Sequence, residues 1–147
     1  MHGVTFPKGT DGWSRHQANT LLRAVEDLFH RADIEALVGT FTEDCVFRFG
    51  GQPEQTGRAA LRRLFLCRLA RQQDYRVRKT CLAIDGNKLA IRWEDSWIDK
   101  TSGNARACVG LEVWTMSGGK IAAWEASLNA RENDVVTDLD CLSGPVA

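Results

Sequence analysis

Residues 88–129 constrain the fold more than any other part of the chain, because they contain three strand-like segments joined by short turns. In residues 88–98 large apolar side chains alternate with polar ones, which is the period-two pattern of a strand with one buried face. The glycine-containing turns at 85–87, 101–104 and 117–119 are too short to cross back over a sheet. Together with the strand formers of residues 75–84, they predict a four-stranded antiparallel meander.

Two acidic residues interrupt the apolar faces of these strands. Asp95 lies between Trp93 and Trp97 on one strand face, and Glu112 shares a face with Trp114. Burial disfavours the charged form of a carboxyl group, and two close carboxylates resist double ionisation, so at least one pKa is expected to rise. A protonated carboxyl beside an ionised one supplies both an acid and a base. Asp95 and Glu112 are therefore the candidate catalytic residues, and a structural role for each is the alternative.

The N-terminal part shows helical periodicity in two consecutive segments. Ser14 and Gln17 fit a capping box at the start of a helix that runs to about Arg31. Asp33 can cap a second, short helix over Ile34–Phe41. We therefore expect two helices before the first strand.

A short strand at Cys45–Phe49 is followed by a third helical segment over residues 58–71. Eight basic residues lie between Arg58 and Lys79, and we expect them to form a solvated face, with a local anion site as the alternative. Helices followed by strands indicate an α+β fold, in which the three helices cover one face of a curved antiparallel sheet.

Length and charge narrow the class of protein. At 147 residues the chain is expected to form a single domain, residues 1–147, with an irregular arm at 1–13 and a tail at 130–147. The 19 basic and 19 acidic side chains balance, so no overall field favours nucleic acid or a membrane surface. No apolar run approaches the roughly 20 residues that span a bilayer, and no signal-like N-terminus is present. We expect a cytoplasmic protein that binds neither nucleic acid nor membrane.

The five cysteines form no Cys-x-x-Cys pair, and no histidine stands at ligand spacing from one. We expect them to be small buried hydrophobic residues in a reducing compartment, with a nucleophilic or metal-binding role as the alternative. The sequence also lacks a phosphate-binding glycine loop, a nucleotide fingerprint and a serine triad. No metal and no cofactor are therefore expected.

The strand face opposite Glu112 is also apolar, because it carries Val109, Leu111 and Val113. Helices cover only one face of such a sheet, so a homodimer through the outer sheet face is the expected cover, and an exposed apolar face is the alternative. The alternation leaves open the roles of three polar residues near this face: Arg48, Ser127 and Asn129.

The order of these elements, together with particular residues, resembles the SnoaL-like branch of the nuclear transport factor 2-like superfamily over Leu21–Asn129. The passages Ala32–Leu37 and Phe41–Phe47 are similar to the superfamily's helix-to-first-strand passage. Within this superfamily, the chain resembles one uncharacterised bacterial subfamily more closely. The residues that carry this closer resemblance are Thr56-Gly57-Arg58, Asp74-Tyr75-Arg76, Asp85-Gly86-Asn87, Trp97, Ser102-Gly103-Asn104, Gly110, Glu112, Trp114 and Ala126-Ser127-Leu128-Asn129.

The resemblance implies a cone in which the concave sheet face and the helices enclose a pocket. Alternate residues of each strand should line it, around Asp95 and Glu112. The expected lining residues are Phe47, Phe49, Trp93, Trp97, Cys108, Trp114, Trp124, Ala126 and Leu128.

The same resemblance implies roles for the two acids. Glu112 falls where ketosteroid isomerase-like members carry an acid that donates a hydrogen bond to an oxyanion, and Asp95 falls where limonene epoxide hydrolase-like members carry an acid–base aspartate. Phe49 replaces the proton-shuttling aspartate of the first group. Trp93 and Ala126 replace an arginine and an aspartate of the second.

Neither constellation is complete, so neither specific activity carries over. The implied function is binding of a small hydrophobic or aromatic molecule and cofactor-free acid–base chemistry on it, such as isomerisation, cyclisation, dehydration or epoxide opening. A non-catalytic ligand-binding or interaction module on the same fold is the alternative.

Overall fold

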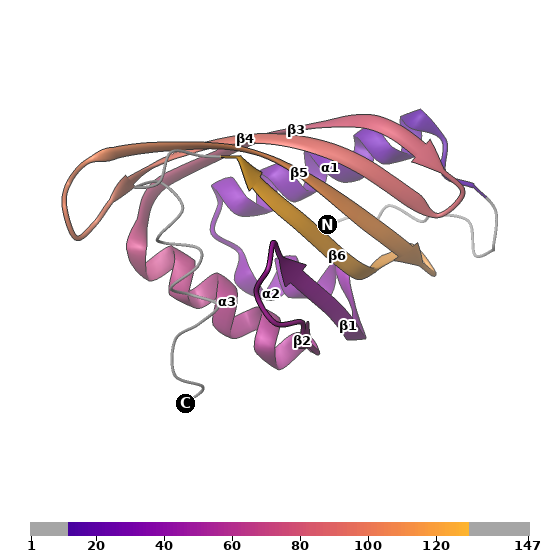
Figure 1. Ribbon diagram of the computed structural model, residues 1–147, viewed down its shortest axis with the longest axis horizontal. Coiled ribbons are helices and arrows are strands. Elements are labelled where there is room, and N and C mark those ends of the chain that lie inside the picture. Colours follow the sequence, from indigo (N-terminus) through magenta and orange to yellow (C-terminus); the bar gives the residue numbers. More distant parts are fainter. Residues whose placement is uncertain (1–11, 130–147) are drawn as a thin grey trace.

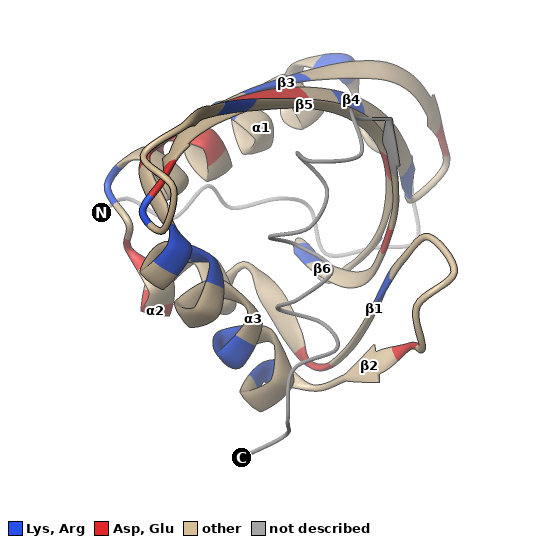
Figure 2. Cartoon of the chain, turned by 60° about the vertical axis from the view of Figure 1, so that its left-hand side comes forward, with Lys and Arg blue, Asp and Glu red and all other residues tan. Residues whose placement is uncertain are grey.

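A curved six-stranded sheet with three helices on its inner side makes up the computed structural model, which describes residues 12–129 (Figure 1). Seen from the side, the sheet curls into an open arc around the helices (Figure 2). The α+β cone is therefore confirmed. The elements, in chain order, are α1 (Arg15–His30), α2 (Ile34–Gly39), β1 (Phe41–Phe49), β2 (Gln55–Thr56), α3 (Arg58–Arg71), β3 (Gln72–Asp85), β4 (Lys88–Asp99), β5 (Ala105–Ser117) and β6 (Lys120–Asn129).

The strands lie in the order β2-β1-β6-β5-β4-β3. Strands β3 to β6 form the expected antiparallel meander. Strand β1, however, pairs parallel with β6, so the sheet is mixed, and the expectation of a wholly antiparallel sheet was wrong at this pairing. Between β1 and β6 the chain passes through α3 and four strands, β2 to β5, and such a long connection permits parallel pairing.

The helix starts follow the sequence signals, but one helix end does not. The Ser14 capping box is formed, and the Asp33 side chain accepts a hydrogen bond from the Ala36 N–H at 3.2 Å. Helix α2 ends at Gly39, and Phe41 opens β1 instead of closing the helix. The Phe41 ring lies 5.9 Å from the ring of Trp124, so tertiary packing overrides helical periodicity here.

Polar side chains of α1 bind the exposed backbone edge of β3. The Glu26 carboxylate accepts a hydrogen bond from the Lys79 backbone N–H at 2.6 Å. Edge strands expose unpaired backbone groups that invite pairing with other chains, and these contacts satisfy them while fixing the helix along the strand. The pairs of helix side chain and strand residue are Arg15 with Cys81, Arg23 and Glu26 with Lys79, and His30 with Val77.

Three of the cysteines are buried free thiols, as expected: Cys45, Cys81 and Cys108. Burial raises the pKa of the Cys45 thiol above its usual range, which disfavours a reactive thiolate there. Cys67 departs from the expectation, because it is disulfide-bonded.

The predicted tail at 130–147 and residues 1–11 of the predicted arm lie outside the described residues. Trp13 packs against the core, and its backbone N–H donates to the Gly86 carbonyl oxygen at 3.0 Å. None of the helices within residues 12–129 has the length and hydrophobicity needed to cross a membrane.

Candidate functional site

The inner face of the sheet holds the predicted pocket residues. Asp95 is 6% exposed and Glu112 is 3% exposed, so both candidate acids are buried. Strand β6 includes Leu128, but the position of its side chain lies outside what the structure describes. The other predicted lining residues are all buried: Phe47, Phe49, Trp93, Trp97, Cys108, Trp114, Trp124 and Ala126.

A bulge near the start of β3 determines which side chains enter the interior from that strand. The register with β4 shifts between Gln73 and Arg76, and Asp74 has a φ of 54°. An extra residue in one strand changes the alternation of its side chains, so Gln72 and Tyr75 are both buried although they are an odd number of positions apart. The bulge therefore directs Tyr75 toward Asp95.

Asp95 belongs to a chain of polar groups contributed by three elements. The Tyr75 hydroxyl of β3 donates to Asp95 Oδ2 of β4 at 2.5 Å. In turn, Arg68 Nη2 of α3 donates to the Tyr75 oxygen at 3.1 Å and lies 3.9 Å from Asp95 Oδ2. All three side chains are buried, and the Arg68 guanidinium also lies 5.2 Å from the centre of the Tyr75 ring. The tyrosine hydroxyl is thus held between a cation and a carboxylate.

Glu112 has different partners. Lys79 Nζ donates to Glu112 Oε1 at 2.7 Å, and Trp124 Nε1 donates to Oε2 at 3.1 Å. The Lys79 ammonium also lies 5.6 Å from the ring of Trp93 and 5.4 Å from that of Trp114, distances typical of cation–π contacts. Both oxygens of Glu112 therefore accept hydrogen bonds from groups that only donate.

Trp93 lies between the two acids. In the β4–β5 register Asp95 is opposite Cys108, whereas Glu112 is opposite Ile91, so the acids are four positions apart, or roughly 13 Å along the strands. Trp93 is opposite Gly110, and a Cβ atom at Gly110 would stand 2.1 Å from the Trp93 ring. The indole therefore lies flat on the glycine backbone, and the two acids occupy separate polar clusters.

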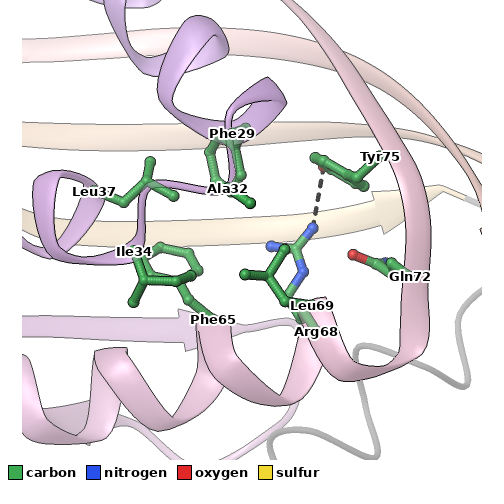
Figure 3. Close-up of a pocket in the computed structure, with 9 residues that line it drawn as sticks. All are labelled: Phe29, Ala32, Ile34, Leu37, Phe65, Arg68, Leu69, Gln72 and Tyr75. Atoms are coloured by element: carbon green, nitrogen blue, oxygen red, sulfur yellow. Dashed lines mark hydrogen bonds between the residues drawn. The ribbon is translucent and has the colours of Figure 1, made fainter.

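A small interior pocket lies between these clusters. It has a volume of about 20 Å³, which is room for about one water molecule. A second pocket of about 10 Å³ lies between the helices and the start of β3 (Figure 3). Both pockets include Phe29, Arg68 and Tyr75 among their lining residues. The aromatic side chains expected to line an open hollow here fill most of it.

Three residues of this site were not predicted from the sequence: Arg68, Tyr75 and Lys79. Two of them, Arg68 and Lys79, belong to the basic run expected to be solvated, yet they are 7% and 4% exposed. That expectation was wrong for these two residues, because each side chain reaches a buried carboxylate. The sequence did contain a signal for Lys79. It lies two positions from Val77 and from Cys81, and these apolar residues, with Tyr75, mark the inner face of β3. The position of Arg68 depends on how α3 packs, so sequence gave no comparable signal.

The site contains no evident metal-binding group. Within residues 12–129, no three histidine, cysteine, aspartate or glutamate side chains gather closely enough to hold a metal ion. The polar groups of the interior are instead carboxylates paired with cations or with phenol and indole donors.

Comparison with solved structures shows the same fold in proteins of low sequence identity. A candidate polyketide cyclase from Xanthomonas campestris pv. campestris superposes with a TM-score of 0.72 at 20% identity, covering 84% of this chain and 98% of its own. A ketosteroid isomerase-like protein from Erwinia carotovora atroseptica gives 0.62 at 19% identity, with 80% and 97% covered. An LEH-like epoxide hydrolase from M. tuberculosis gives 0.61 at 15% identity, with 87% and 90% covered.

No curated protein matches the sequence. The family model of the SnoaL-like domain, by contrast, matches residues 22–124, a span that runs from α1 into β6 and includes Arg68, Tyr75, Lys79, Asp95 and Glu112. The chain therefore belongs to the SnoaL-like domain family.

Proposed function

We propose that this protein binds a small hydrophobic or aromatic molecule inside the cone and performs cofactor-free acid–base chemistry on it. The reaction classes that fit are isomerisation, cyclisation, dehydration and epoxide opening. One observation carries the proposal: Tyr75, whose hydroxyl is held between Arg68 and Asp95, is among the residues that line an interior pocket.

Tyr75 is the group that would meet the substrate. Its oxygen can take a proton from a substrate carbon or hydroxyl while its own proton passes to Asp95 Oδ2, 2.5 Å away. The substrate proton then resides on Tyr75 and the former tyrosine proton on Asp95, and the reverse transfer completes the cycle. Arg68 stabilises negative charge on the phenol oxygen, because its guanidinium donates to that oxygen. Asp95 is thus the base behind Tyr75, and Arg68 is a positioning residue.

Lys79 supplies positive charge on another wall of the same pocket. Lys79 is 4% exposed, and its ammonium group is paired with Glu112. A preorganised donor in a dry site stabilises an oxygen that gains negative charge during a reaction. In this proposal Glu112 holds Lys79 in place and does not itself exchange protons with the substrate.

The structural neighbours support a reaction of this type. Those named above are a candidate cyclase, an isomerase-like protein and an epoxide hydrolase, and all share the fold at 20% identity or less. At such identities the fold is shared and the chemistry is not carried over.

A non-catalytic ligand-binding module is the second candidate. The observation that favours it is the complete hydrogen bonding of Glu112, whose two oxygens are held by Lys79 and Trp124, as in a structural carboxylate. On this alternative the interior charges fix the shape of the cone, and the bound molecule leaves it unchanged.

The test is turnover of a panel containing an unsaturated ketone, a β-hydroxy ketone and an aromatic epoxide, with purified protein. We expect at least one compound to be converted, and we expect Asp95→Asn and Tyr75→Phe to lower kcat by about 10²- to 10⁴-fold. Glu125→Gln, which removes an exposed carboxylate on β6, is the control and should keep the wild-type rate. Binding without conversion of any compound would favour the second candidate.

For the outer sheet face we propose a second copy of this chain as the partner. Leu111 is 55% exposed and Val113 is 39% exposed, and this face also carries the Arg92–Glu94 ion pair, so both charge signs are available for a two-fold contact. Leu111→Asp should convert a dimer into a monomer in light scattering. A wild-type protein that is monomeric at every concentration would exclude the contact.

A further inference from the structure

One cysteine of α3 takes part in a disulfide. Cys67 is disulfide-bonded, whereas the three other cysteines among the described residues, Cys45, Cys81 and Cys108, are free thiols. The sequence contains five cysteines, and the fifth is Cys141. A disulfide within the chain needs a second cysteine, so the count leaves Cys141 as the partner of Cys67.

We propose that residues 130–147 act as a redox-sensitive strap on α3. In this strap a disulfide joins Cys141 to Cys67, and the residues around Cys141 dock on the exposed face of the helix. The strap fastens α3 when the surroundings are oxidising and releases it when they are reducing. The inference does not depend on the proposed function, because it concerns how the fold is held together.

The exposed face of α3 suits such a segment. Arg63, Leu66, Cys67 and Ala70 recur at helical spacing on this face, and Leu66 is 52% exposed. The disulfide-bonded Cys67 is half-buried. Helix α3 also contains five arginines and no acidic residue, as the blue turns of the helix show (Figure 2). The helix therefore offers an exposed apolar side chain close to positive charge.

The sequence around Cys141 has the complementary chemistry. Residues 130–147 contain four acidic residues and one basic residue. Two acids and two leucines lie within three positions of Cys141: Asp138, Leu139, Asp140 and Leu142. Opposite charges attract, and apolar groups gain free energy when they leave water. A bond between Cys141 and Cys67 therefore brings acidic side chains to a basic helix and leucines to Leu66.

The length of the segment permits the contact. Strand β6 ends at Asn129, and Cys141 follows 12 residues later. An extended chain of this length spans roughly 40 Å. A domain of this size has a radius of gyration of about 15 Å, so the segment can reach α3 from the end of β6.

The disulfide would enclose most of the sheet. The chain between Cys67 and Cys141 contains the four strands β3 to β6. A cross-link that closes such a long loop restricts the unfolded chain and so stabilises the folded one. It also holds the helix that carries Arg68, whose guanidinium donates to the Tyr75 hydroxyl. Oxidation therefore fixes α3 against the sheet, and reduction loosens it.

The strap opens and closes by thiol–disulfide exchange. A dithiol reductant attacks the protein disulfide, both protein sulfurs leave as thiols, and the reductant becomes a disulfide. In the other direction oxidised glutathione takes up two electrons and two protons from the two protein thiols and becomes two molecules of reduced glutathione. The thiols of Cys45, Cys81 and Cys108 are buried, which keeps them out of this exchange.

Peptide mapping tests the pairing. The full chain is equilibrated with oxidised glutathione, unfolded in the presence of N-ethylmaleimide, and digested without reductant. We expect the peptide that contains Cys67 to be joined to the peptide that contains Cys141, and the other three cysteines to be alkylated. The pairing is overturned if Cys67 is bonded to Cys67 of a second copy or to glutathione, or if all five cysteines are alkylated.

Reduction tests the fastening of α3. Dithiothreitol should lower the melting temperature of the wild-type protein by about 5–10 °C and speed the hydrogen exchange of the α3 amides. Cys141→Ser should behave like the reduced protein and should not respond to dithiothreitol. The matched control is Ser143→Ala, two positions away, which should respond as the wild type does. A Cys141→Ser variant that responds like the wild type would contradict the strap.

Charge reversal tests the docking on α3. Arg63→Glu should lower the equilibrium constant for closing the disulfide with oxidised glutathione by about threefold at low salt, because it turns an attraction into a repulsion. The matched control is Arg78→Glu, the same change at an exposed position of β3, and it should leave the constant unchanged. If Arg63→Glu closes the disulfide as readily as the wild type, or if both variants lose equally, the acidic segment does not dock on this face.

Discussion

Asp95 and Glu112 are buried carboxylates on one face of the sheet, yet their partners differ in kind. Glu112 is held by an ammonium and an indole N–H, which can only donate. Asp95 accepts a hydrogen bond from the Tyr75 hydroxyl, which can both donate and accept, and Tyr75 is one of the residues that line a pocket. Burial alone therefore does not make a carboxyl group chemically useful. A buried carboxyl group becomes useful when its hydrogen-bond partner can pass a proton to it, as the Tyr75 hydroxyl can.

The largest expected effect concerns the Glu112 cluster. Lys79→Met should lower the free energy of unfolding by about 3–5 kcal/mol, because it leaves Glu112 buried without its cation. Urea unfolding followed by tryptophan fluorescence measures the change. The double variant Lys79→Met/Glu112→Leu should recover most of the loss, since it removes both charges. A double variant no more stable than the single one would show that the ion pair itself stabilises the fold.

A smaller loss is expected in the Asp95 cluster. Tyr75→Phe should cost about 1.5–3 kcal/mol, because it removes a hydrogen bond to a buried carboxylate while keeping the ring. The comparison between the clusters predicts that turnover falls far more in Tyr75→Phe than in Glu112→Gln. Equal losses of kcat in these two variants would show that both clusters contribute alike to turnover.

The Trp93 ring, which separates the two clusters, can be tested through the glycine on which it packs, Gly110. Gly110→Ala should cost about 1–3 kcal/mol, because the new methyl group would overlap the Trp93 ring, which must move. The near-ultraviolet circular dichroism of the tryptophans should change as the indole tilts. An unchanged spectrum with unchanged stability would mean that Trp93 does not depend on the glycine for its place.

The smallest effect on stability is expected at an exposed ion pair with good geometry. It gives a reference value against which the buried ion pairs can be compared. Arg62 donates two hydrogen bonds to Glu35, at 2.8 and 3.0 Å, and these hold the pKa of Glu35 below its usual range. Because the folded pKa is the lower one, this contribution is present above the unfolded pKa of about 4.3 and disappears as the pH falls through the folded value. Glu35→Gln should therefore be slightly less stable than the wild type at neutral pH.

The same pair of chemical denaturation curves should converge as the pH is lowered through the folded pKa, since the wild-type carboxyl then becomes protonated and loses its advantage. A difference that persists at low pH would mean that the Glu35 side chain stabilises the helix by packing rather than by charge.

Much of the fold followed from local patterns. The Ser14 and Asp33 caps, the turns and the alternation of β4 and β5 could all be predicted from the sequence, because each depends on a few neighbouring residues. The burial of Asp95 and Glu112 was readable for the same reason, since side-chain alternation places them with the tryptophans. The end of α2 could not be predicted in this way, because Phe41 belongs to β1, which pairs with residues about 80 positions away.

The candidate site was only half predictable, since its acids follow strand alternation and its cations do not. Arg68 reaches Tyr75 through the packing of α3, and Lys79 reaches Glu112 across Trp93 from another strand. The bulge at Asp74, which directs Tyr75 inward, shifts the alternation by one residue without any marked signal in the sequence.

The sequence alone was enough to predict where the first two helices begin, which strand faces are apolar and that Asp95 and Glu112 are buried, because these depend on periodicity and local hydrogen bonds. Only the tertiary structure decided that β1 runs parallel to β6, that each acid has its own cation, and that aromatic rings fill most of the interior. These features depend on register, on one bulge and on the meeting of side chains far apart in the chain. Period-two alternation fixes a strand's face and leaves its partners undetermined.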